Sequence, residues 1–112
     1  MENGFYATKI ADSDARAGIT VIEDSCIRGG DSHFLYSGTI SLSANQEVVA
    51  NIKIHAYADQ DGEPFGTKDE AFDLSLIGES TDVGFKMTGY SPSGREIVIN
   101  AFKLANIDLS DN

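Results

Sequence analysis

Between residues 47 and 58 the chain reads EVVANIKIHAYA, a stretch in which apolar and polar side chains alternate. One set of alternate positions carries Val48, Ala50, Ile52, Ile54 and Ala56, and the other carries Asn51, Lys53 and His55. Successive side chains of a strand point to opposite faces, so this alternation predicts a half-buried antiparallel strand.

The segment just before it, residues 33–43, repeats the alternation. Its apolar face carries Phe34, Tyr36, Gly38, Ile40 and Leu42. The connection Ser43–Gln46 is short and polar, so the two segments are predicted to form a hairpin.

Weaker alternating runs complete a set of eight strands. They cover residues 4–10, 17–23, 26–28, 71–79, 84–90 and 96–104. Eight short strands with hairpin-length connections and no long amphipathic helix favour an all-β, closed, antiparallel up-and-down barrel, because closure leaves no edge strand unpaired. A two-sheet sandwich is the alternative. We expect one barrel domain over residues 1–107 and a flexible C-terminal tail over residues 108–112.

One connection is long. Residues 59–70 contain Pro64 and several acids, which makes this segment a candidate lid or binding loop with a short helical turn near Lys68–Ala71. Its acidic spacing is similar to that of a calcium loop, but Pro64 stands where such a loop needs glycine. We interpret it as a solvated acidic loop.

Composition limits the partners. Acidic residues number 18 against 8 basic ones in 112 residues, a formal net charge of -10, which disfavours nucleic acid and anionic membranes as partners. Cys26 is the single cysteine, so an intrachain disulfide and a thiolate zinc site are excluded. With no signal-peptide pattern and no apolar run long enough to span a membrane, we expect a cytoplasmic protein.

The sequence offers little for catalysis. His33 and His55 lie on neighbouring predicted strands, and no nucleophile-elbow motif accompanies them. We therefore expect no enzymatic activity, no catalytic residues, no cofactor and no metal.

Two local features have structural interpretations. Gly29, Gly30 and Asp31 predict a tight turn with positive φ at the glycines, in which Asp31 accepts a hydrogen bond from a following amide.

In the last strand, Ile97, Ile99 and Ala101 alternate with Val98, Phe102 and Leu104, so both faces are apolar. Either the tail residues Ile107 and Leu109 or a second copy of the chain should cover the outer face. We expect Val98, Phe102 and Leu104 to form the interface of a homodimer.

An eight-stranded barrel either fills its interior or encloses one small ligand. The inward positions mix bulky residues with the small Gly38, Ala50, Gly78 and Gly89, a pattern that fits both cases. We favour a filled core. A cavity, if present, would be lined by Phe34, Tyr36, Gly38, Ala50, Ile52 and Leu74.

Two segments carry a family resemblance. The start MENGFY and residues 27–38, IRGGDSHFLYSG, resemble the pattern of the GrlR-like family of small bacterial proteins, named after a negative regulator of type III secretion. The resemblance implies an eight-stranded lipocalin-like barrel, often dimeric, with no known catalysis. It also implies that a protein partner, a transcriptional activator in secretion regulators, binds an acidic run in the loop between the two central strands. The corresponding loop here is Ala44, Asn45, Gln46 and Glu47, which contains one acid.

Together these observations favour a non-enzymatic protein-interaction module that regulates transcription or type III secretion through a protein partner. The alternative function is that of a carrier or sensor of a small apolar ligand.

Overall fold

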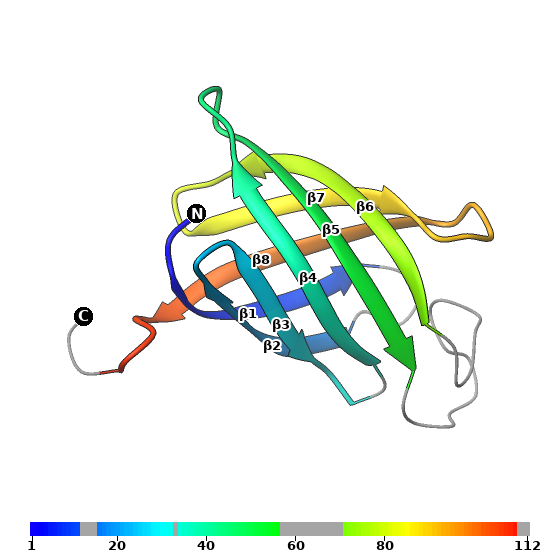
Figure 1. Cartoon of the computed structure of the whole chain (residues 1–112), viewed down its shortest axis with the longest axis horizontal. Coiled ribbons are helices and arrows are strands. Elements are labelled where there is room, and N and C mark those ends of the chain that lie inside the picture. The colour runs from blue at the N-terminus through cyan, green and yellow to red at the C-terminus, as the bar shows by residue number, and fades with distance from the viewer. Residues whose placement is uncertain (12–15, 33, 57–70, 110–112) are drawn as a thin grey trace.

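The computed structural model describes residues 1–11, 16–32, 34–56 and 71–109. Within them the chain forms eight strands that close into one antiparallel barrel, in which each strand pairs with its neighbours in sequence and β1 pairs with β8 (Figure 1). The strands are β1 (Gly4–Ala11), β2 (Arg16–Glu23), β3 (Cys26–Gly30), β4 (Phe34–Leu42), β5 (Glu47–Ala56), β6 (Ala71–Ser80), β7 (Gly84–Tyr90) and β8 (Glu96–Ala105).

The predicted barrel is confirmed, and the sandwich alternative is wrong. All eight predicted strands are present, with ends that differ by a few residues. Ala71 begins β6, so the helical turn expected to end there is wrong at that residue, while the rest of the long connection lies outside the described residues. No helix occurs among the residues that the structure describes, and so none there could cross a membrane.

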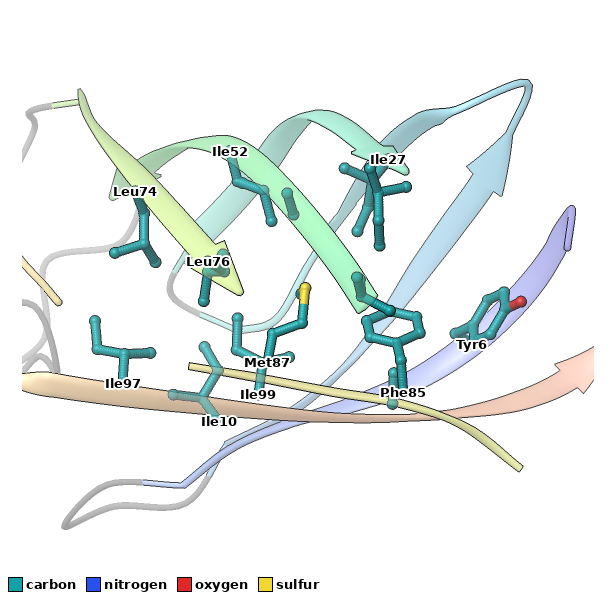
Figure 2. Close-up of a cluster of buried hydrophobic side chains, with 14 of the residues drawn as sticks. Tyr6, Ile10, Ile27, Ile52, Leu74, Leu76, Phe85, Met87, Ile97 and Ile99 are labelled. Atoms are coloured by element: carbon teal, nitrogen blue, oxygen red, sulfur yellow. The ribbon is translucent and has the colours of Figure 1, made fainter. Parts of the chain in front are cut away.

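Alternation along the strands produces the core. The side chains that point inward belong to all eight strands and include Tyr6, Ile22, Ile27, Phe34, Ile40, Ile54, Leu76, Phe85, Met87 and Ile97, each at most 3% exposed (Figure 2). The rings of Tyr6 and Phe85 pack with their centroids 5.5 Å apart. Burying such side chains supplies the main favourable free energy of folding.

Gly38 shows why some inward positions are small. A Cβ atom at Gly38 would collide with the backbone oxygen of Asn51 and would lie 2.8 Å from Cα of Ile52, both on the neighbouring strand β5. The absence of a side chain therefore allows β4 and β5 to approach each other closely at this position.

We predict that Gly38→Ala destabilises the barrel by about 1–3 kcal/mol, because the added methyl group has no space and the strands must move apart. Chemical denaturation measures this loss. Thr39→Ala, at the exposed next position, should change the free energy of unfolding by less than about 0.5 kcal/mol. A Gly38→Ala protein as stable as the parent would contradict this role of the glycine.

Candidate functional site

The Gly29-Gly30-Asp31 motif is partly as predicted. The described glycines with φ in the left-handed region do not include Gly29 or Gly30, which lie within β3, so the prediction of positive φ there is wrong. The predicted bond of Asp31 is confirmed, because the backbone N–H of Phe34 donates to Asp31 Oδ1 at 2.9 Å. The Tyr36 hydroxyl donates to Asp31 Oδ2 at 2.6 Å. Asp31 therefore fixes the turn between β3 and β4.

Gly29 allows β2 and β3 to approach each other closely and is not part of the turn itself. A Cβ atom there would collide with the backbone oxygen of Ile19 and lie 2.7 Å from Cα of Thr20 on β2. The distinctive glycines thus belong to the packing of neighbouring strands, and the turn itself depends on the aspartate.

The outer face of β8 is apolar, as its sequence suggests. Phe102 is 48% exposed and Leu104 is 58% exposed, while Ile97, Ile99 and Ala101 point into the core. Val98 is half-buried and pairs with Thr88 of β7, in a cross-strand row that continues to Ile77 of β6. Val98 therefore lies beside a different set of neighbours from Phe102.

Barrel closure adds residues from the start of the chain. Ala7 of β1 pairs with Phe102 on one side and with Ile19 of β2 on the other, and Phe5 pairs with Val21. We call the resulting surface the apolar outer face. It consists of Phe5, Ala7, Ile19, Val21, Phe102 and Leu104.

Sequence reasoning overlooked the β1 and β2 part of this face, although a signal was present. Phe5 and Ala7 alternate with inward Tyr6 and Thr8, so β1 is apolar on its outer side too. The same holds for Ile19 and Val21 on β2.

Acidic side chains are absent from this part of the surface. The outward positions of residues 5–9, 17–21 and 98–104, all of them described, carry no aspartate or glutamate, and Lys9 is the one charged side chain among them. The whole chain has 18 acidic residues. Depletion of charge is typical of the centre of a protein–protein interface.

The C-terminal tail does not cover the apolar outer face within the described residues. After β8 the chain forms a turn in which the N–H of Leu109 donates to the carbonyl of Asn106. Of the two tail residues expected to cover it, Leu109 is mostly exposed and Ile107 is half-buried, and both Phe102 and Leu104 stay exposed. Residues 110–112 of the tail lie outside the described residues.

The β4–β5 hairpin presents Ala44, Asn45, Gln46 and Glu47, the loop that the family resemblance points to, as an exposed turn. Gln46 has a φ of 65°. Its backbone and side-chain oxygens accept bonds from Ser80 of β6, at 3.2 Å and 3.0 Å. The tip of this hairpin is therefore fixed against the neighbouring strand.

The residues considered for a cavity lie inside the barrel. Phe34, Ala50, Ile52 and Leu74 are buried in the core, while Tyr36 and Gly38 are half-buried on the same inward face. An interior cavity of about 20 Å³ is lined by side chains that include Tyr36 and Ile52. That volume is enough for about one water molecule.

Polar groups face this small cavity. The hydroxyls of Thr8 and Thr20, both buried, lie 3.2 Å apart and hydrogen-bond each other across β1 and β2. The pairing satisfies two buried polar groups that would otherwise destabilise the core.

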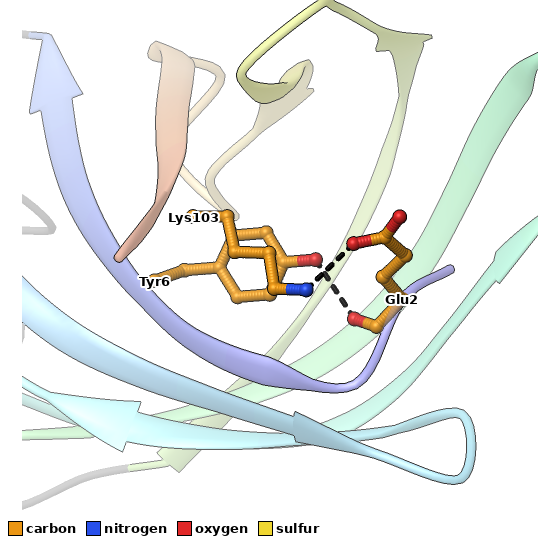
Figure 3. Close-up of polar contacts among 3 residues, drawn as sticks. All are labelled: Glu2, Tyr6 and Lys103. Atoms are coloured by element: carbon orange, nitrogen blue, oxygen red, sulfur yellow. Dashed lines mark hydrogen bonds and ion pairs between the residues drawn. The ribbon is translucent and has the colours of Figure 1, made fainter. Parts of the chain in front are cut away.

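At the end of the barrel where β1 begins, three residues form a polar cluster (Figure 3). Lys103 Nζ contacts Glu2 Oε1 at 2.6 Å, and the Tyr6 hydroxyl donates to the backbone oxygen of Glu2 at 2.8 Å. Lys103 is paired with inward-pointing Tyr6 across the β1–β8 ladder and therefore points to the inside of the barrel. Sequence reasoning did not find this cluster, because only closure brings residue 103 next to residue 2.

The electrostatics of this cluster follow from its geometry. The hydrogen bond and the charge of Lys103 lower the pKa of the Glu2 carboxyl group. Burial, with a smaller contribution from the charge of Glu2, raises the pKa of the Tyr6 hydroxyl, which stays protonated and can donate its bond at neutral pH.

Other candidates remain isolated or lie outside the described residues. His55 is exposed on β5, and Cys26 is half-buried. His33 and the Asp59–Glu70 loop, with its calcium-like spacing, fall outside the part of the chain that the structure describes. Among the described residues, no three His, Cys, Asp or Glu side chains are grouped so that they could hold a metal ion.

Comparison with known proteins finds neither a family model nor a curated protein that matches this chain. The resemblance to the GrlR-like family therefore stays a prediction.

We predict that Tyr36→Phe destabilises the protein by about 1–3 kcal/mol, because it removes a hydrogen bond to a carboxylate that fixes the β3–β4 turn. Tyr90→Phe, at a mostly exposed position, is the matched control and should have little effect in the same thermal or chemical denaturation. Equal losses in the two variants would contradict the role of the Asp31 contact.

The ion pair with Lys103 should be visible in the titration of the Glu2 carboxyl group. Since Lys103 lowers its pKa, the ion pair persists above the ordinary value of 4.5 and is lost as pH falls through the lowered pKa. An NMR pH titration should show a midpoint below 4.5 in the parent, and Lys103→Met should return it toward 4.5. A midpoint that does not move in this variant would show that the two side chains are not paired in solution.

Proposed function

We propose that this chain is a non-enzymatic protein-interaction module of the GrlR-like type. It forms a homodimer through the apolar outer face and regulates transcription or type III secretion in the cytoplasm through a protein partner. The β4–β5 hairpin, residues 44–47, is the place where that partner binds. The observation that carries the proposal is an exposed, acid-free apolar face on a molecule of net charge -10.

The dimer is supported by charge as well as by hydrophobicity. Two copies with a net charge of -10 repel each other over most orientations. The repulsion is smallest where acidic side chains are absent, and that surface also carries Phe102 and Leu104. A two-fold axis would place the same surface of each copy against the other and cover both at once.

The position of the β4–β5 hairpin and the hydrogen bonds at its tip support its assignment as the partner-binding site. It projects from one end of the barrel (Figure 1), and it is separate from the apolar outer face, which is built from β1, β2 and β8. The bonds from Ser80 to Gln46 hold its tip in one conformation. A fixed turn binds a partner with a smaller loss of conformational entropy than a mobile one.

The packed interior supports this function over carriage of a ligand inside the barrel. The cavity of about 20 Å³ next to Thr8 and Thr20 is far smaller than the roughly 300 Å³ at which typical small-molecule sites begin. An interior ligand would have to displace core side chains such as Phe85 and Met87.

We predict that sedimentation velocity at micromolar concentrations shows a dimer for the parent and a monomer for Phe102→Lys. The substitution places a charge within the apolar outer face, on its β8 side next to Ala7 of β1. It changes the net charge only from -10 to -9 (-10 + 1), so general repulsion does not increase. Phe102 is half exposed in the single chain, so the variant should keep its fold, which circular dichroism checks.

Ile77→Lys is the matched control. Ile77 is 59% exposed on β6, outside the apolar outer face, and receives the same charge. This variant should sediment as the parent does. A parent that is monomeric at all concentrations would remove the dimer from the proposal, and dissociation by Ile77→Lys as well would show that the interface lies elsewhere.

A further inference from the structure

The end of the barrel where β1 begins holds an open cavity of about 640 Å³. Its walls include Met1, Leu42, Val83, Lys103 and the turn between β6 and β7. Small-molecule sites typically measure roughly 300–1,000 Å³, combine apolar walls with a few polar groups, and occur in the mouths of β-barrels. This cavity, which we call the mouth, has the size and place of such a site.

Lys103 gives the mouth its cation. Its side chain is only 27% exposed and points to the inside of the barrel from β8, at the level of Tyr6. Leu42 at the end of β4 and Val83 in the β6–β7 turn provide exposed apolar surface on the same cavity. The lining also includes the acids Glu2 and Asp82 and the hydroxyl side chains of the β6–β7 turn. A cation next to apolar surface is complementary to a molecule with an anionic head and an apolar body.

Glu2 already shows that a carboxylate fits on this lysine. Its Oε1 lies 2.6 Å from Lys103 Nζ, and the Glu2 side chain is 76% exposed. An ion pair with so much exposure contributes little to stability. A carboxylate from solution can therefore replace Glu2 if its apolar part gains contacts that the glutamate side chain does not make.

We propose that the mouth binds a small monocarboxylate with an apolar body, whose head pairs with Lys103 in place of Glu2 and whose body lies on Leu42 and Val83. The filled core below the mouth, with Tyr6 packed on Phe85, keeps the ligand at the entrance of the barrel. This site is separate from the apolar outer face and does not depend on the proposed dimer.

The test is an NMR titration of the full chain with octanoate, which has both chemical features. Acetate carries the carboxylate alone, and 1-octanol carries the apolar body alone. Octanoate should shift the amide signals of Leu42, Val83 and Lys103 and should bind at least about ten-fold more tightly than acetate or 1-octanol, since neither control molecule makes both contacts.

Variants distinguish the roles of the two charged residues. Glu2→Gln removes the internal competitor and should tighten octanoate binding by up to about five-fold. Lys103→Met should weaken it by about ten-fold or more, and Lys103→Arg, which keeps the charge, should largely retain it. In the Lys103→Met background, Glu2→Gln should have no further effect.

Several results would overturn the site. Octanoate binding that Lys103→Met leaves unchanged, or that Glu2→Gln weakens, would show that the carboxylate does not replace Glu2. If acetate or 1-octanol binds as tightly as octanoate, the site does not require both a carboxylate and an apolar body. Shifts confined to the apolar outer face would place the fatty acid on Phe102 and Leu104 instead. If Lys103→Met fails to fold, the octanoate affinity of Glu2→Gln relative to the parent still tests whether the ligand replaces Glu2.

Discussion

Backbone hydrogen bonds between β1 and β8 close the sheet, and both candidate surfaces depend on this ladder. The ladder joins residues that are 87 to 100 positions apart in the chain, with Ala7 opposite Phe102 and Tyr6 opposite Lys103. On the outside it merges the apolar residues of two strands into one surface. On the inside it places Lys103 next to Glu2 at the mouth. Such long-range pairing has a large entropic cost of loop closure, which the burial of the common core offsets.

The interior of the barrel acts as a scaffold. Large inward side chains fill it and leave a cavity of about 20 Å³ beside Thr8 and Thr20. Glycines such as Gly38 let neighbouring strands approach closely. Close-packed cores leave little room for chemistry or for a ligand. Recognition by this protein is therefore best sought at its outer face, at the β4–β5 hairpin and at the mouth.

Much of the fold could be predicted from the sequence, because a period of two is a local property of each strand. The segment from Glu47 to Ala56 shows this most clearly. The local pattern also predicted the apolar outer side of β8 and the hydrogen bond that the Phe34 N–H donates to Asp31. It failed at Gly29 and Gly30, where glycine serves the approach of a neighbouring strand, an effect that depends on tertiary packing.

The apolar outer face and the mouth were harder to predict, because each combines residues from the two ends of the chain. Nothing near Lys103 in sequence indicates that Glu2 will pair with it, and nothing near Phe102 indicates Ile19 two strands away. Both follow only once the sheet is known to close between its first and last strands. Closure itself is inferred from the need to avoid unpaired edges, an argument about the whole fold and not about any one segment.

In the proposed homodimer, a second copy covers the apolar outer face in solution. Relaxation of methyl signals by a soluble gadolinium chelate, at concentrations of the assembled protein, tests it most directly. In the single chain Leu104 is 58% exposed, Ile19 49% and Ile77 59%. We expect Leu104 and Ile19 to be protected from the chelate and Ile77 not to be. Relaxation in proportion to these single-chain exposures, with no protection of Leu104 or Ile19, would contradict it.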